Sequence, residues 1–370
     1  MIRPSLAAAL LASVSLAACG SPDREPQGAP AAPTAASAVR AAGATGALAP
    51  SSIETAVWKA DAVAAPAASA PSAPSATAPG VGGPQAATTT PPRPEIIRAQ
   101  ILLDRARFSP GAIDGLGGEN TRQAVAAYAE AKDIASDGEL NAEVFASLTQ
   151  AAAPVMAEYV ITPADVAGPF IAAVPTDLEA QSELEALSYT SVLEALAEKF
   201  HVTEALLTAL NPGIDFSRAG QAIVVPAITD QSLPAEVTRI LVDKSESSVR
   251  AFDAAGNLLA FYPATIGSSA RPAPTGRVTV VGVANEPNYT YDPERLTYGT
   301  ADRKFVVAAG PNNPVGSVWI DLSRDTYGIH GTPDPSKIAK TASNGCVRLT
   351  NWSAEQLAAA VKPGVEVIFS

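Results

Sequence analysis

The chain has 370 residues, enough for two or three domains, and a formal net charge of −12 at pH 7. Residues 1–94 hold five Lys or Arg and four Asp or Glu, so the rest carries 20 basic against 33 acidic side chains, a net of −13. Without a cluster of Lys and Arg, this balance excludes a nucleic-acid-binding protein, which needs a basic face toward the phosphates.

The N-terminus, MIRPSLAAALLASVSLAAC, is typical of an export signal. Arg3 precedes an apolar run at 6–18 that is too short to span a bilayer comfortably. The end of this run, LAAC at 16–19, resembles the lipobox of bacterial lipoproteins. The resemblance implies a signal peptide at 1–18 and acylation of Cys19, which would anchor the protein to a membrane. The alternative is an ordinary cleaved signal.

The residues after Cys19 bear on location. Gly20 and Ser21 lack the aspartate that holds some lipoproteins at the inner membrane. We therefore expect an exported protein on the periplasmic face of a bacterial membrane, with the outer membrane favoured.

Residues 19–94 predict a lipid-anchored linker. They are mainly Ala, Pro, Ser, Thr and Gly, and such a segment cannot bury enough apolar surface to offset the entropy lost on ordering. We expect this linker to be disordered, with partial polyproline character. Within it, SSIETAVWKADAV at 51–63 predicts one short helix.

Residues 95–150 predict a small three-helix domain. Apolar residues at helical spacing in 95–108 indicate the first helix. Asn120 followed by Gln123 predicts a capped start for the second helix, and Asn141 a cap for the third. With its G-x-x-D-G turn before T-x-x-A-V, the segment resembles the peptidoglycan-binding domain. The alternative is a packing module without a ligand.

Residues 184–227 predict two helices and a closing strand. Ser191 with Glu194 predicts a capping box, and Thr203 the start of the second helix. The segment resembles a LysM domain, a βααβ unit that binds glycans containing N-acetylglucosamine. It lacks the usual Gly-Asp before the first helix, so both a working module and a structural remnant remain open. We expect His201 to pack or to stabilise a helix end, and 159–175 to be extended and packed against a neighbouring domain.

Residues 236–370 predict a mainly-β domain. RILVDKSESSVRAF at 239–252 alternates apolar and polar residues as a half-buried strand does, and 253–257 is a hairpin turn. Further strand patterns follow, then one amphipathic helix at 353–361 and a final strand, VEVIF. The fold expected is thus multidomain, with a mainly-β domain after a three-helix domain and a βααβ module.

The stretch YGIHGTPDPSKIAKTASNGCVRL at 327–349 carries the chemistry. If Cys19 is acylated, Cys346 is a lone thiol in an exported protein. A cysteine attacks as the thiolate and needs a base, and His330 is the only histidine at 236–370. Backbone N–H groups at Gly345 and Cys346 could hold an oxyanion, and Arg348 suits a substrate carboxylate. By residue type alone, a buried inert cysteine is the alternative.

This stretch resembles the signature of L,D-transpeptidases, HG followed after a gap by S-x-G-C-[VI]-R. The matching residues are His330, Gly331, Ser343, Gly345, Cys346, Val347 and Arg348, with supporting similarity at 241–243, 265–267, 274–276 and 310–316. The resemblance implies that Cys346 is the nucleophile and His330 its base, with a backbone carbonyl holding the second ring nitrogen. It implies substrate binding by Arg348, Tyr327, Gly331, Thr332, Asn344 and Ser343, and requires no metal or cofactor. Asn344 stands where many members have a second histidine.

The implied function is cross-linking of peptidoglycan. Cys346 would attack a tetrapeptide stem at its third residue, release D-Ala and pass the acyl group from a thioester to an amine. The partners expected are stem peptides, glycan strands and the membrane bound through Cys19. Two alternatives stay open: a carboxypeptidase or endopeptidase that uses water as the acceptor, and a non-catalytic wall tether.

Overall fold

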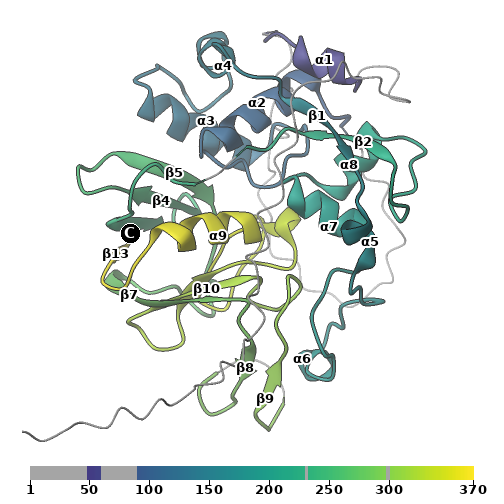
Figure 1. Ribbon diagram of the computed structural model, residues 1–370. Coiled ribbons are helices and arrows are strands. Elements are labelled where there is room, and N and C mark those ends of the chain that lie inside the picture. Colours follow the sequence, from purple (N-terminus) through teal and green to yellow (C-terminus); the bar gives the residue numbers. More distant parts are fainter. Residues whose placement is uncertain (1–47, 60–89, 230–231, 297–300) are drawn as a thin grey trace, which may run out of the picture. The chain divides into compact units, whose positions relative to one another are not determined.

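The computed structural model describes residues 48–59, 90–229, 232–296 and 301–370 (Figure 1). All of them belong to one unit, Ala32–Ser370. The predicted signal peptide and Cys19 lie outside the described residues, as does most of the predicted linker. Among the helices that are described, none has the length and apolar character needed to cross a membrane.

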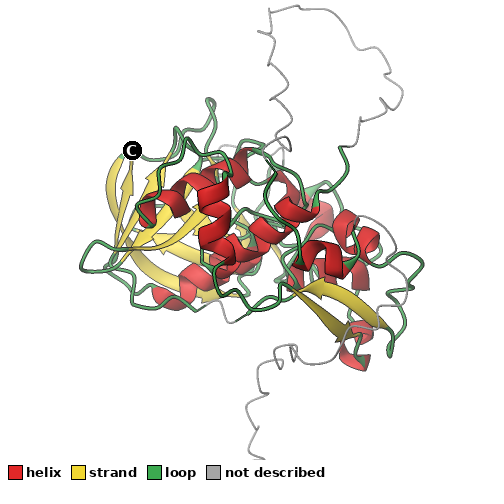
Figure 2. Cartoon of the chain, turned by 90° about the horizontal axis from the view of Figure 1, so that it is seen from above, coloured by secondary structure: helices red, strands yellow, loops and turns green. Residues whose placement is uncertain are grey.

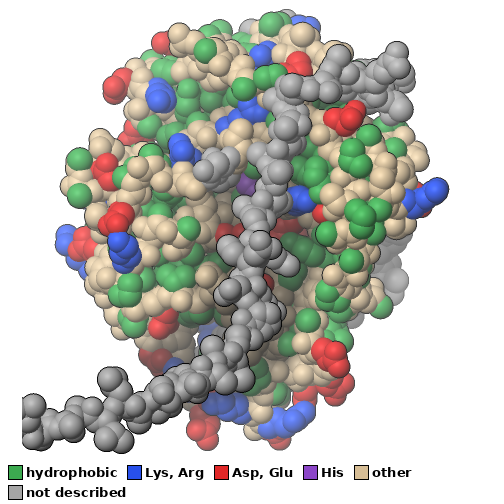
Figure 3. Space-filling model, viewed as in Figure 1, with side chains coloured by type: hydrophobic (Ala, Val, Ile, Leu, Met, Phe, Trp, Pro, Cys, Tyr) green, Lys and Arg blue, Asp and Glu red, His purple; other side chains and the backbone are tan. Residues whose placement is uncertain are grey.

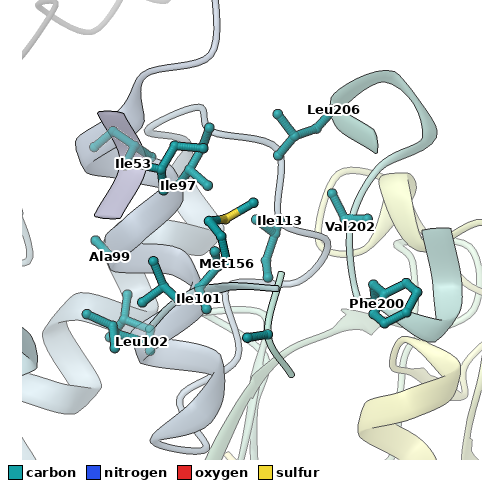
Figure 4. Packing of buried hydrophobic residues seen from close by; sticks show 14 of the residues in the cluster. Ile53, Ile97, Ala99, Ile101, Leu102, Ile113, Met156, Phe200, Val202 and Leu206 are labelled. Carbon is teal, nitrogen blue, oxygen red and sulfur yellow. The ribbon is translucent and has the colours of Figure 1, made fainter. Parts of the chain in front are cut away.

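The prediction of disorder is wrong for residues 48–59, which pack against the domain that follows. Helix α1 (Pro50–Glu54) lies inside the predicted linker, and the helix predicted at 51–63 is thus present, shorter and starting at Pro50. Ile53 is fully buried beside Ile97 (Figure 4), and Arg98 Nη1 donates to the Ala56 carbonyl at 2.7 Å. Leu48 and Trp58 also pack against the core, so several contacts hold this short segment.

The three predicted helices are α2 (Pro94–Arg105), α3 (Glu119–Ala131) and α4 (Ala142–Thr149). Asn141 caps α4 as predicted, because its side chain accepts a hydrogen bond from Val144 N at 2.9 Å. The prediction for Asn120 is wrong. Helix α3 begins at Glu119, so Asn120 lies inside its first turn, and Asn120 Nδ2 donates to the Ile338 carbonyl at 3.1 Å. A long-range contact thus replaces the expected local cap.

The βααβ module consists of β1 (Met156–Val160), α7 (Val192–Lys199), α8 (Glu204–Leu210) and β2 (Ala222–Pro226), with β1 antiparallel to β2. Its first strand precedes the predicted boundary at 184, because a long insertion separates β1 from α7. The insertion holds α5 (Pro163–Ala167) and α6 (Leu178–Gln181). The prediction of an extended chain at 159–175 is therefore wrong at α5, but Ile171 and Val174 pack, as expected, against a buried cluster of the C-terminal domain that includes Tyr291.

The caps of this module follow the prediction in part. Ser191 accepts a hydrogen bond from Glu194 N at 3.0 Å, but the Glu194 carboxylate accepts from Thr190 rather than closing the predicted box. Thr203 caps α8 through Leu206 N. His201 packs as expected: it is buried, its Nδ1 lies 3.0 Å from Asp104 Oδ2, and its ring stacks on Trp352.

The three-helix domain and the βααβ module share one apolar core, in which side chains such as Ile97, Ile113, Met156, Val202 and Leu206 are buried (Figure 4). The Ile113 N–H donates to the His201 carbonyl at 2.8 Å, and Thr203 N donates back to Ile113 at 3.0 Å. The two segments are therefore packed as one body, although their sequences predict separate modules.

The C-terminal domain is built on a nine-stranded sheet of order β5-β4-β3-β13-β7-β10-β11-β12-β6, whose strands gather near the C-terminus (Figure 2). The segment 239–252 forms two antiparallel strands rather than the single one predicted, because 244–247 make a turn. The bounds are β3 (Arg239–Asp243), β4 (Ser248–Phe252), β5 (Leu258–Pro263), β6 (Thr265–Ile266), β7 (Gly276–Asn285), β10 (Val318–Leu322), β11 (Gly328–His330), β12 (Val347–Arg348) and β13 (Glu366–Phe369).

Three further elements complete this domain. Helix α9 (Asn351–Ala360) is the predicted amphipathic helix and packs on β10 and β11. Strands β8 (Tyr289–Tyr291) and β9 (Phe305–Val307) pair beside the large sheet, and the short helix η2 (Pro335–Lys337) follows β11. Leu187 from the insertion packs with side chains of β8 and β9, so the βααβ module reaches this pair of strands.

Acidic and basic side chains are interspersed on the described surface seen in Figure 3. Several form ion pairs, among them Arg277 with Glu366 at 2.7 Å. Exposed pairs of this kind contribute little to stability, so the apolar cores hold the fold together.

Candidate active site

The two halves of the predicted motif meet because β11 and β12 are adjacent parallel strands. Their register sets Ile329 opposite Val347 and His330 opposite Arg348. Successive side chains of a strand point to opposite faces of a sheet. Ile329 and Val347 are buried in the apolar core, so His330 and Arg348 project together from the other face, with Cys346 two residues before Arg348.

His330 is held in one orientation. Its Nδ1 donates to the Gly331 carbonyl at 2.7 Å, and its ring stacks on Trp319 with centroids 5.5 Å apart. A carbonyl only accepts, so the ring proton is assigned to Nδ1 and the lone pair to Nε2. Burial, and to a smaller extent the charge of Arg348, lowers the pKa of His330 to about 3. Hydrogen bonds to the backbone of Gly331 and Val315 oppose this shift but do not outweigh it. His330 is therefore a neutral base at physiological pH.

Cys346 follows a turn that only glycine adopts readily. Gly345 has φ +105°, and a Cβ there would lie 2.8 Å from Tyr327 Cε1. The Cys346 thiol donates to the Thr326 carbonyl at 3.6 Å. Burial raises the pKa of Cys346, while a hydrogen bond from the Gly328 backbone and the charge of Arg348 oppose that shift. The resting pair is thus a neutral thiol and a neutral imidazole.

The turn that presents Cys346 is fixed by Ser343, which is itself buried. Ser343 Oγ donates to the Cys346 carbonyl at 2.6 Å, and Ser343 N donates to the Gly267 carbonyl at 2.9 Å. The first bond closes the turn on itself, and the second ties the turn to the chain just after β6. The local sequence SNGC therefore folds into a rigid presentation of the thiol.

A cavity of about 650 Å³ lies over these residues. Four of the predicted site residues line it: Cys346, His330, Arg348 and Asn344. Its other walls come from α6, from β8, from β10 and from the loops before β10 and β11; they include Leu178, Tyr289, Thr290, Pro314, Val315, Trp319, Asp321, Asp325 and Thr326. The cavity joins a thiol, a neutral imidazole and a guanidinium, and these are groups with which acyl transfer from an anionic peptide can be carried out.

The remaining predicted site residues lie elsewhere. Thr332 lines a neighbouring cavity of about 270 Å³, of which Arg348 is also a wall. Gly331 is closely packed, since a Cβ there would lie 2.1 Å from Asn351 Oδ1. Tyr327 packs against Gly345, and Ser343 supports the turn.

Three contributors to the site were missed in the sequence: Trp319, Thr326 and Asn351. Trp319 stacks on the His330 ring, the Thr326 carbonyl accepts a hydrogen bond from the Cys346 thiol, and Asn351 organises the loop after His330. Asn351 follows the motif by three residues, and this proximity was the one available signal. Among the described residues, no group of three or more His, Cys, Asp or Glu could hold a metal ion.

Two family models match the chain. Residues 237–369 match the L,D-transpeptidase catalytic domain, and residues 92–148 match a domain described as "Putative peptidoglycan binding domain".

Curated relatives carry matching names. A Bacillus licheniformis protein named "Putative L,D-transpeptidase YkuD" is 31% identical over 178 residues, which is 47% of this chain and 91% of that protein. The Escherichia coli "Probable L,D-transpeptidase ErfK/SrfK" is 30% identical over 185 residues, 48% of this chain and 59% of that protein.

Solved structures that match part of the chain include L,D-transpeptidase 3 from Mycobacterium tuberculosis in complex with a faropenem-derived adduct. It is 16% identical, with a TM-score of 0.31, over 36% of this chain and 60% of that one. An Enterococcus faecium L,D-transpeptidase C442S mutant is 21% identical with a TM-score of 0.29, over 47% of this chain and 64% of that one. The chain thus spans about three-fifths of the length of these solved relatives.

Proposed function

Because this chain belongs to the L,D-transpeptidase family of peptidoglycan-acting enzymes, we propose that Cys346 is the nucleophile with which it cross-links the cell wall. The observation that carries this proposal is the cavity into which the thiol, the neutral imidazole of His330 and the guanidinium of Arg348 all face. Strand β11 carries His330, and β12 with the residue before it carries Arg348 and Cys346, so neither strand alone could supply all three groups.

The first step is acylation of Cys346 by a tetrapeptide stem. The sulfur attacks the carbonyl carbon of the third residue while the thiol proton passes to His330 Nε2. The carbon–nitrogen bond to D-Ala then breaks, and His330 returns the proton to the departing amine. A thioester remains on Cys346, which splits one difficult exchange into two easier steps.

The neutral resting pair suits this step. Burial keeps the imidazole unprotonated and the thiol protonated, so proton and charge move only as the sulfur attacks. The negative charge that develops on the substrate oxygen is held by the backbone N–H groups of Gly345 and Cys346. Gly345 allows the close approach because it carries no side chain.

The substrate is positioned from the edges of the cavity. Arg348 binds a carboxylate of the stem, and Asn344 offers an amide on the rim for a hydrogen bond. Gly331, Ser343 and Tyr327 act on the substrate indirectly, by holding the loop after His330 and the turn before Cys346. Thr332 contacts whatever enters the neighbouring cavity.

In the second step an amine attacks the thioester. The side-chain amine of the third residue in a neighbouring stem would give a cross-link, and water would give a tripeptide instead. The peptidoglycan-binding domain at 92–148 brings the enzyme to this substrate. The βααβ module would add glycan affinity, and acylated Cys19 would tether the exported protein to a membrane.

The test is to incubate the protein with peptidoglycan rich in tetrapeptides and to identify the products by mass spectrometry, with Cys346→Ala as control. Dimers linked between third residues, formed only with Cys346 present, support the proposal. Tripeptides alone would mean that water is the acceptor. No cysteine-dependent product would refute the assignment of Cys346 and leave the non-catalytic tether.

A further inference from the structure

The side-chain amide of Asn351 contacts three backbone groups and one carboxyl group beside the active site. Its Oδ1 accepts from Ser317 N at 3.1 Å and from Thr332 N at 3.0 Å. Its Nδ2 donates to the Pro311 carbonyl at 3.2 Å and to Glu198 Oε1 at 2.5 Å. Asn351 begins α9 of the catalytic domain, whereas Glu198 lies on α7 of the βααβ module, outside the residues that match the catalytic family.

A short path leads from Asn351 to the base. The Thr332 N–H that Asn351 binds belongs to the residue after Gly331, and the Gly331 carbonyl holds His330 Nδ1 at 2.7 Å. Gly331 packs so closely on Asn351 that an added Cβ would meet its Oδ1 at 2.1 Å. The position of the Asn351 amide therefore sets the carbonyl that orients the imidazole.

The same module holds the loop that forms one wall of the catalytic cavity. Leu187 exchanges backbone hydrogen bonds with Ala309 and Asn312, at 3.0 and 2.9 Å. Asn312 Nδ2 donates to Glu194 Oε1 of α7 at 2.8 Å and to the Ser188 carbonyl at 3.0 Å. Two residues further along this loop, Pro314 begins the part that faces the cavity. Helix α7 thus contacts the site along two routes.

We propose that Glu198 is a positioning residue for His330, acting through the side-chain amide of Asn351 and touching neither substrate nor nucleophile. This inference rests on the proposed function, because it concerns the geometry of the same base. It gives the βααβ module a role in catalysis that needs no bound glycan. Catalysis then depends on a residue some 130 positions before the base in the chain.

The contact is expected to depend on pH. Burial, followed by the charges of Glu355 and Glu194, raises the pKa of Glu198 to about 8, although the Asn351 hydrogen bond opposes this. Tyr189 also faces Glu198, and Glu204 and Asp334 line a cavity of about 370 Å³ together with it. At neutral pH the carboxyl is protonated and accepts from Asn351. A carboxylate is the better acceptor for Asn351, but burial and the charges of Glu355 and Glu194 outweigh that hydrogen bond. Ionisation therefore favours arrangements in which Glu198 reaches water and leaves Asn351.

The test compares acylation of the wild-type protein with that of Glu198→Gln and Glu198→Ala, using a disaccharide-tetrapeptide and intact-protein mass as the readout. Glu204→Gln is the matched control, because it removes a carboxylate from the same cavity without touching Asn351. Rates are measured from pH 6.5 to pH 9.5 and expressed as ratios to wild type, so that ionisation of Cys346 cancels.

A glutamine keeps the acceptor oxygen and cannot ionise. We expect the Glu198→Gln ratio to be near one at pH 6.5 and to rise about fivefold by pH 9.5. Glu198→Ala should lose about tenfold in kcat with little change in KM, because the base and not the substrate is misplaced. Glu204→Gln should follow the wild-type profile.

A flat Glu198→Gln ratio, or a Glu198→Ala protein that acylates at the wild-type rate, would overturn the inference. If Glu198→Ala fails to fold, the pH dependence of the Glu198→Gln ratio decides alone. A wild-type protein that forms no adduct would instead refute the proposed function, so the two failures are distinguishable.

Discussion

Replacing the buried carboxyl of Glu198 by the amide of glutamine should stabilise the folded protein at neutral pH. Glu198 is only 9% exposed, and burial raises the pKa of its carboxyl from 4.5 to about 8. In the unfolded chain the same group ionises around pH 4.5. Folding of the wild type must therefore take up a proton at neutral pH, whereas Glu198→Gln keeps the Asn351 contact without this requirement.

The sign and size follow from proton linkage. For an acid whose folded pKa is raised, the stability that is present below pH 4.5 is lost as the pH rises toward 8. Each pH unit across this window costs about 1.4 kcal/mol. The variant should accordingly exceed the wild type by about 1 kcal/mol at pH 5 and by about 3 kcal/mol at pH 7.

Urea unfolding followed by circular dichroism at both pH values measures this gap. Glu185→Gln is the control, because it removes the same charge from an exposed position. Its difference from wild type should stay within about 0.5 kcal/mol at both pH values. A Glu198→Gln gap that is the same at pH 5 and pH 7 would refute the claim that this carboxyl is protonated in the folded protein.

Three further predictions concern the thiol, the Asn351 contact and the N-terminal helix. In a Cys19→Ser protein, alkylation of Cys346 by iodoacetamide should accelerate about tenfold from pH 7 to pH 8, because burial raises the thiol pKa. An alkylation rate that does not change between these pH values would contradict that. Gly316→Ala should cost at least about 2 kcal/mol in urea unfolding, since Gly316 has φ +65° and its Cβ would lie 2.1 Å from Asn351 Oδ1. Ile53→Ala should lower the unfolding free energy by about 3 kcal/mol if α1 is part of the core, and an unchanged value would show that α1 does not pack stably.

The residues proposed for catalysis could be selected from the sequence because they lie in one short stretch with fixed spacing, and in the structure His330, Cys346 and Arg348 line one cavity. His330 and Arg348 become neighbours through the parallel pairing of β11 and β12, which the motif implies without naming the strands. Most strands of the C-terminal domain could also be recognised from their residue pattern. That pattern predicts a single strand for the hairpin at 239–252 and does not mark β8, β11 or β12, which have only two or three residues.

What the sequence did not reveal depends on contacts between distant residues. Strand β1 was missed because its partner β2 lies more than 60 positions later, beyond a long insertion. Asn120 has the local pattern of a helix cap but bonds to Ile338 instead. The contact of Glu198 with Asn351 joins residues 153 positions apart, and no periodicity or motif encodes such a pair.

The most direct test of the central claim is to trap the acyl-enzyme. The protein is mixed with a disaccharide-tetrapeptide, quenched in acid, digested and mapped by mass spectrometry. The account predicts an adduct equal to the substrate minus D-Ala on the peptide that contains Cys346, absent from the Cys346→Ala protein and reduced in His330→Ala. An adduct on another residue, or none while cross-linked products still form, would contradict it.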